Sequence, residues 1–208
     1  VERSKTQALA EGHDFSVATA VFFKRSPRVV TSGIDGRVCL WDLNTGAQIA
    51  RLPGTGITAA IAVSADEQTI VTGSDIGADD RQQVQLWNVA EAIAKYSAGA
   101  PAVPFGSGAI EKEHRLRAVT FLDGSSTDFC TGHQSGLVSL WKIAGNKPVK
   151  SADMVRHTKG ILAVVAIPGG SQIATGALDG TVVVWDTAAA KPLRSFDHNK
   201  AYPGDFIE

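Results

Sequence analysis

Residues 29–42 read VVTSGIDGRVCLWD, and this stretch decides how the rest of the chain is interpreted. Two apolar runs rich in β-branched residues flank a turn that contains Asp35 and Gly36, and the second run ends in Trp41 and Asp42. An Asp-Gly pair between two such runs is a strong short-range signal for a β-hairpin. The stretch therefore predicts two antiparallel strands joined by a tight turn.

The same pattern recurs three times further along the chain. Residues 129–142 read FCTGHQSGLVSLWK, residues 173–186 read IATGALDGTVVVWD, and residues 70–88 hold a longer version, IVTGSDIGADDRQQVQLWN. Two of the aligned columns are invariant, one in Thr and one in Trp: Thr31, Thr72, Thr131 and Thr175, and Trp41, Trp87, Trp141 and Trp185. Successive Trp residues lie 46, 54 and 44 positions apart. A period near 40–45 residues with a terminal Trp-Asp is typical of a β-propeller blade.

On these repeats the chain resembles the WD40-repeat family over essentially its whole length. The resemblance implies an all-β fold, a WD40-type β-propeller of about four four-stranded antiparallel blades, as part of a larger ring of seven or eight. Strands apolar on both faces fit blades that are sandwiched between neighbours. Either a second copy, as a homodimer, or further blades of the same longer chain would then cover the two outermost faces.

We expect residues 1–208 to form one propeller segment. Its expected parts are the outer strand of a preceding blade at 1–11, blade one at 12–53, blade two with insertions at 54–113, blade three at 114–155, blade four at 156–198, and the start of a further blade at 199–208. Blade two departs most from the repeat. Its insertions, 74–83 and 90–113, are expected to be loops, the second opening with a short helical turn at 90–96.

Two sets of four residues combine a hydroxyl, an imidazole, a carboxylate and an indole at matching spacing. They are His13, Thr31, Asp35 and Trp41, and His157, Thr175, Asp179 and Trp185. Thr-His-Asp suggests nucleophilic catalysis, but the resemblance implies a structural tetrad that satisfies buried polar groups and holds a loop to its blade. In blade three Ser135 stands in the Asp position and His114 is one residue out of register, and blade two has no matching His. We therefore expect weaker fixation of the loops of these two blades.

The candidate partner-binding site lies in the insertions of blade two and at the start of blade three. Its residues are Asp75, Asp79, Asp80, Arg81, Tyr96, Phe105, Lys112, His114 and Arg115. Mixed charge with one or two aromatic side chains suits a protein or peptide surface. The alternative is a pair of solvated loops that bind nothing.

Composition excludes several classes of function. The formal net charge is −1, which argues against general affinity for nucleic acid or for an anionic membrane. No P-loop, GxGxxG, HExxH or CxxC motif occurs, and the spacing of the acidic residues in 75–80 matches no EF-hand. We therefore expect no catalytic residues, no cofactor and no metal. With Cys39 and Cys130 as the only cysteines, a reducing compartment, the cytoplasm by default, is expected.

The sequence thus predicts a non-catalytic protein–protein interaction scaffold that presents loops to a protein or peptide partner. The alternative is the propeller domain of a longer multidomain enzyme or sensor whose chemistry lies elsewhere. A purely structural role in oligomerisation is a third interpretation. Fold alone does not discriminate among them.

Overall fold

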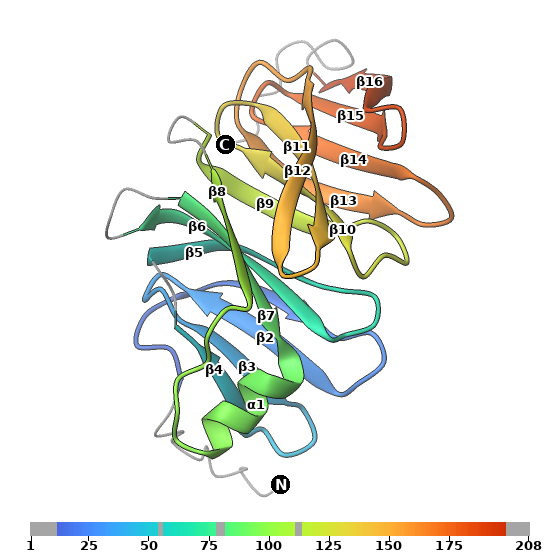
Figure 1. The fold of residues 1–208 in the computed structure, drawn as a ribbon. Coiled ribbons are helices and arrows are strands. Elements are labelled where there is room, and N and C mark those ends of the chain that lie inside the picture. The colour runs from blue at the N-terminus through green and yellow to red at the C-terminus, as the bar shows by residue number, and fades with distance from the viewer. Residues whose placement is uncertain (1–11, 54–55, 78–81, 111–113, 199–208) are drawn as a thin grey trace, which may run out of the picture.

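The structure is a computed structural model that describes residues 12–53, 56–77, 82–110 and 114–198. The segments 1–11 and 199–208, expected to belong to neighbouring blades, lie outside the described residues. The described chain forms four separate antiparallel sheets of four strands each, with strands in sequence order, so each sheet is one blade (Figure 1). The all-β fold expected from the sequence is confirmed.

The strand bounds follow the repeats closely. Blade one consists of β1 (Val17–Phe22), β2 (Arg28–Gly33), β3 (Val38–Asp42) and β4 (Gln48–Leu52). Blade two consists of β5 (Gly56–Val63), β6 (Thr69–Gly77), β7 (Gln82–Asn88) and β8 (Gly106–Ile110), with α1 (Val89–Ser97) between its last two strands. Blade three consists of β9 (Leu116–Phe121), β10 (Asp128–His133), β11 (Leu137–Ala144) and β12 (Lys147–Val155). Blade four consists of β13 (Ile161–Ile167), β14 (Gln172–Ala177), β15 (Thr181–Asp186) and β16 (Lys191–Asp197).

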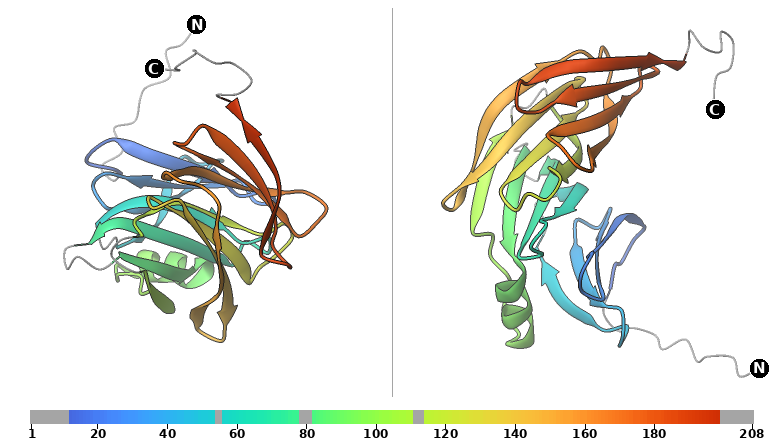
Figure 2. Two further views of the ribbon diagram at one scale, coloured as in Figure 1. Left: turned by 90° about the horizontal axis from the view of Figure 1, so that it is seen from above. Right: turned by 90° about the vertical axis from the view of Figure 1, so that its right-hand side faces the viewer.

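The blades stack around an open arc, with blades one and four at its two ends (Figure 2). The first strands of successive blades contact one another and form the inside of the arc. Each gap between blades is filled by one apolar cluster. The Trp side of a blade faces the preceding blade, as Trp87 packs with Leu40 and Trp185 with Leu140. The Val and Leu side chains of the third strand, such as Val38 and Leu40, face the following blade.

The end blades carry the same columns but have no neighbour to cover them. Val182 of blade four is 44% exposed, whereas Val38 and Val138 at the same position of blades one and three are at most 1% exposed. On the Trp side of blade one, Phe22 is 66% exposed, whereas Phe121 at the equivalent position of blade three is 6% exposed. The described residues therefore leave one apolar face open at each end of the arc.

Blade two differs from the expectation that its insertions are loops. In the first insertion, β6 continues to Gly77 and β7 begins at Gln82, so most of it prolongs a hairpin. The second insertion contains the expected helical turn, which extends to the nine-residue α1. Asn88 caps this helix by accepting a hydrogen bond from the Glu91 amide at 2.9 Å, and Val89 and Ala92 are buried in the cluster that holds the β4 residues Ala50 and Leu52.

The second insertion also contains the outer strand of blade two, β8, which the sequence did not predict. Its residues, GSGAI, have low strand propensity and little apolar alternation. The glycines are required because β8 lies against the β11–β12 hairpin of blade three. A Cβ at Gly106 would collide with the carbonyl of Asn146, and one at Gly108 would press on the ring of Pro148.

Candidate functional site

Blade one contains a complete hydrogen-bonded chain from its Trp to the connection that precedes its first strand. Trp41 Nε1 donates to Thr31 Oγ1 at 2.9 Å, and Thr31 Oγ1 lies 2.8 Å from His13 Nε2. The other imidazole nitrogen, Nδ1, lies 3.1 Å from both carboxylate oxygens of Asp35. Every polar group has a partner if Nδ1 carries the proton and the Thr31 hydroxyl donates to Nε2.

Blade four repeats this series of hydrogen bonds at similar distances. The Trp185–Thr175 and Thr175–His157 pairs lie at 2.8 and 2.7 Å, and His157 Nδ1 lies 3.1 Å from Asp179. Asp179 also accepts hydrogen bonds from the Thr158 amide at 2.8 Å and from Thr181 Oγ1 at 2.7 Å. Burial opposes ionisation of this carboxyl, but the hydrogen bonds and the charge of His157 together lower its pKa to about 2. The carboxylate thus joins two loops at one end of the blade, which we call the tetrad end.

In blade three a different His completes the chain. Thr131 Oγ1 accepts from Trp141 Nε1 at 2.8 Å and lies 2.8 Å from Nε2 of His133, which is on the same strand. His133 Nδ1 donates to the carbonyl of His114 at 2.9 Å. His133 stands where blade one has Gly33, and a Cβ at Gly33 would collide with the His13 ring.

His133 therefore occupies the space of the usual imidazole, and His114 is displaced. The His114 ring instead contacts Ser135 Oγ at 2.7 Å. Burial, partly opposed by the hydrogen bond to the His114 carbonyl, lowers the pKa of His133 to about 4, which keeps this ring neutral. His133 was not among the predicted site residues, and the signal that reveals it is a His two residues after the Thr, where the other blades have the small residues Gly33, Ser74 and Ala177.

Blade two keeps only the first hydrogen bond of this series, the one from Trp to Thr. Trp87 Nε1 donates to Thr72 Oγ1 at 2.9 Å, and both side chains are buried. The described residues of this blade contain no His. The loops at the tetrad end of blade two are therefore not held by an imidazole from this part of the chain.

The predicted partner-binding residues fall into separate places. Asp79, Asp80, Arg81 and Lys112 lie outside the described residues, and Asp75 belongs to β6, whose backbone alone is described at this position. His114 and Arg115 begin blade three beside Gln134 and Ser135, where the Arg115 carbonyl accepts from the Gln134 amide at 2.6 Å. The Arg115 side chain is exposed.

Tyr96 and Phe105 do not join His114 and Arg115. Tyr96 lies on α1 and lines a cleft with Arg51 and Pro53 of blade one. Phe105 donates its amide to Leu86, at the end of β7 remote from the tetrad end. The reason is that residues 89–105 connect the third and fourth strands of blade two, and this connection lies at the end of the blade opposite the tetrads.

Two kinds of feature are absent from the part of the chain that the structure describes. No group of three or more His, Cys, Asp or Glu side chains there is arranged to hold a metal ion. No helix in these residues has both the length and the apolar character needed to cross a membrane.

Comparison with protein families gives a result that agrees with the blades. A family model described as "WD domain, G-beta repeat" matches residues 4–42 and 147–186. The second match runs from β12 to the end of β15, that is, from the outer strand of one blade to the third strand of the next. The first match ends at the same point of blade one, at Asp42.

Proposed function

We propose that the chain is a non-catalytic scaffold for a protein or peptide partner. It belongs to the WD40-repeat family, whose repeats generally mediate protein–protein interactions and whose propellers are typically non-catalytic. The binding surface would be formed by the loops at the tetrad end of blades two and three. It would include Asp79, Asp80, His114 and Arg115. Tyr96 and Phe105 are left out, because they lie elsewhere on blade two.

The observation that supports this location is the uneven fixation of the loops. In blades one and four a carboxylate links the loop before the first strand to the turn between the second and third strands. In blade three the corresponding position is Ser135, a neutral and exposed side chain, and His114 is displaced onto it. Loops free of a buried carboxylate can change sequence and shape without leaving a buried charge unpaired.

Mixed charge at this end suits a polar partner surface. Arg115 and Gln134 are exposed, and Arg is among the residue types enriched where proteins bind one another. A rigid set of blades lowers the conformational cost of binding, because only side chains and short loops must be ordered.

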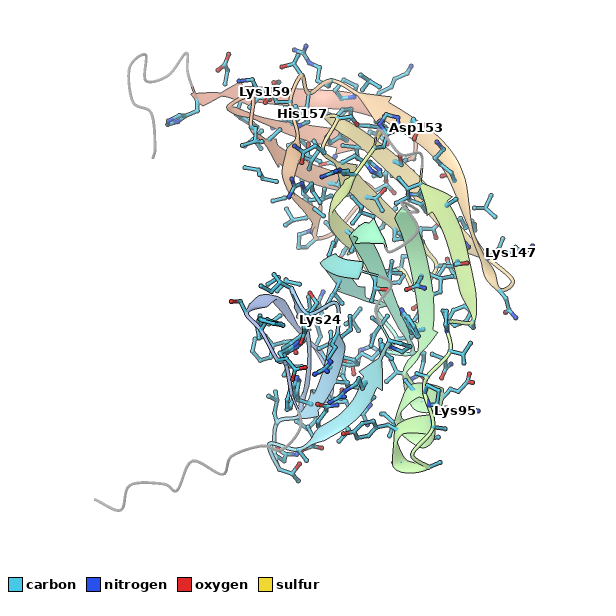
Figure 3. All side chains as sticks on the ribbon, turned by 90° about the vertical axis from the view of Figure 1, so that its left-hand side faces the viewer. Lys24, Lys95, Lys147, Asp153, His157 and Lys159 are labelled. Carbon is cyan, nitrogen blue, oxygen red and sulfur yellow. The ribbon has the colours of Figure 1, made fainter. Side chains whose placement is uncertain are left out.

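Photo-crosslinking tests the location directly. A photoreactive phenylalanine analogue placed at Arg115 should form a covalent adduct with the partner, and mass spectrometry of the adduct would identify it. The same analogue at Lys147 is the matched control. Lys147 is also exposed, but it begins β12 at the end opposite the tetrads, whereas Asp153 lies toward the tetrad end of that strand (Figure 3).

The purified partner then allows a measurement of affinity. Alanine at Asp79, Asp80 and Arg115 together should abolish binding while the melting temperature stays within about 2 °C of the wild type, because surface substitutions seldom change stability by more than about 0.5 kcal/mol. Lys147→Ala should bind normally. Equal adducts from positions 115 and 147, or unchanged affinity of the triple variant, would move the site away from this surface.

A further inference from the structure

At the tetrad end, the turn between β10 and β11 lies directly against the connection between blades three and four. A Cβ at Gly136 would collide with the carbonyl oxygens of His157 and Lys159, at 2.7 and 2.8 Å. A Cβ at Gly160 would press on the carbonyl oxygen of Gln134 at 3.0 Å. The two segments therefore form one continuous surface, and side chains on either of them can contact the same ligand.

Four exposed cationic side chains stand on this surface, and we call them the basic patch: Arg115, Arg117, Arg156 and Lys159. The first two are tied to the turn through Gln134. The Arg115 carbonyl accepts from the Gln134 amide at 2.6 Å, and Arg117 Nε donates to Gln134 Oε1 at 2.5 Å. The other two flank His157, whose ring is fixed by Asp179 at 3.1 Å. The patch thus spans blades three and four.

The tetrad end of blade one carries different charges at the same place. The residue after its tetrad His is Asp14, whose carboxylate lies 2.6 Å from Arg37. In blade three the residue after the displaced His is Arg115, and the turn carries the neutral Ser135. In blade four the residue after the His is the neutral Thr158. The surface therefore changes from acidic groups at blade one to cations at blades three and four.

The described carboxylates near the patch are already engaged. Asp153 pairs with Lys150 at 2.8 Å, and Asp179 is 9% exposed and bound within the tetrad of blade four. Among the described residues, no carboxylate forms an ion pair with Arg115, Arg156 or Lys159. Charges that share one small surface reinforce one another, because screening at physiological salt acts over about 8 Å. The patch therefore favours an anionic ligand.

The kind of cation indicates the kind of anion. Three of the four residues are Arg, and a planar guanidinium matches a carboxylate through two parallel hydrogen bonds. An extended peptide advances about 3.3 Å per residue, so acidic side chains at alternate positions point to one side about 7 Å apart and can meet successive cations. Nucleic acid would require a chain richer in cations, whereas this one has 20 Lys and Arg against 21 Asp and Glu.

We propose that the basic patch binds an acidic, extended segment of the partner polypeptide. This inference rests on the proposed function, because it names the chemistry of the partner at the same surface, and it extends that surface from blade three to blade four. Pairing between exposed charges weakens as salt rises, so the affinity should fall with ionic strength.

Fluorescence anisotropy of the whole chain with labelled, end-blocked peptides tests the proposal. The probes are a peptide that alternates Glu and Ser, the same peptide with Gln in place of Glu, and an oligothymidylate of equal charge. The Glu peptide should bind at least about tenfold more tightly than the Gln peptide at low salt, because charge-assisted hydrogen bonds replace neutral ones. It should also bind more tightly than the oligothymidylate.

Two quadruple variants with equal loss of charge separate the patch from the general charge of the chain. The first replaces the four residues of the basic patch with Gln and should lose the preference for Glu. The second replaces four other exposed cations with Gln and should keep it: Lys142, Lys147, Lys191 and Arg194. Both should melt within about 2 °C of the wild type, because exposed substitutions seldom change stability by more than about 0.5 kcal/mol.

Glu111 and Glu113 precede His114 in the sequence and lie outside the described residues. Replacing both with Gln removes two negative charges beside the patch and should raise the affinity for the Glu peptide at least about threefold. Equal affinity for the Glu and Gln peptides, tighter binding of the oligothymidylate, or a preference that survives the first quadruple variant would overturn the proposal. If position 115 still forms adducts with a partner in that case, the proposed function stands and only the acidic partner segment is refuted.

Discussion

Replacing Asp179 with Asn should destabilise the chain by an amount that depends on pH. Burial opposes ionisation, but hydrogen bonds from Thr181 and Thr158 and the charge of His157 lower the pKa of Asp179 to about 2. The pKa in the unfolded chain is near 3.9. Because the folded-state pKa is the lower one, the ionised carboxylate stabilises the fold above pH 4, and this stabilisation is lost as the pH falls toward 2.

The size of the effect follows from the two pKa values. A pKa lowered from 3.9 to about 2 corresponds to about 2–3 kcal/mol at pH 7, of which roughly half remains at pH 3. The Asp179 side chain is 9% exposed, so screening by solvent reduces this value little. The difference between wild type and Asp179→Asn in the free energy of unfolding should therefore shrink by roughly 1 kcal/mol between pH 5 and pH 3.

Urea unfolding followed by tryptophan fluorescence at pH 7, 5, 4 and 3 measures this difference. Thr175→Val is the matched control, because it leaves Trp185 Nε1 and His157 Nε2 without their partner but removes no carboxylate. It should cost about 2–4 kcal/mol, with little change between pH 5 and pH 3. A penalty for Asp179→Asn that is the same at pH 7 and pH 3 would refute the reasoning, because the carboxylate would then act only through its shape.

Two further predictions concern burial. Trp185→Ala should cost about 3–5 kcal/mol and Trp41→Ala clearly less, as measured by urea unfolding, because Trp185 is fully buried between blades three and four whereas Trp41 is partly exposed on the open face of blade one; equal costs would mean that the Trp41 face is covered in solution. Burial raises the pKa of Cys39 to about 11 and also raises that of Cys130, so both thiols should react with iodoacetamide at pH 8 only at the rate of unfolding; rapid labelling of either thiol by the native chain would contradict its burial.

The repeats predicted most of the fold because every blade requires the same residue types at its equivalent positions. A buried indole needs an acceptor, so Trp and Thr recur together and mark the second and third strands of every blade. The outer strand of blade two was not predictable in this way. Its residues are determined by close contact with Asn146 and Pro148 of the next blade, and glycine at such contacts looks like a loop in the sequence.

The candidate site was less predictable than the fold, for two physical reasons. His133 reaches Thr131 from two residues away on the same strand, whereas His13 reaches Thr31 from a separate loop, so sequence spacing does not relate them. The exposed cations of blades three and four share one surface only because the turn at Gly136 lies against the His157 carbonyl. An exposed Arg or Lys otherwise looks like an ordinary solvated side chain.

Hydrogen bonds at the two ends of the blades have different roles. At the end opposite the tetrads, the turns between the first and second strands bond across blades: Ser26 Oγ donates to Glu67 at 2.7 Å, the Ala65 amide to Ser125 at 3.1 Å, and the Gly169 amide to Asp123 at 2.9 Å. At the tetrad end, the hydrogen-bonded series of Trp, Thr, His and Asp side chains each join loops to one blade only. Since the spacing between blades is secured at one end, loops at the other end can vary without changing how the blades pack. This separation suits a scaffold, because a binding surface can diversify while the frame that holds it stays rigid.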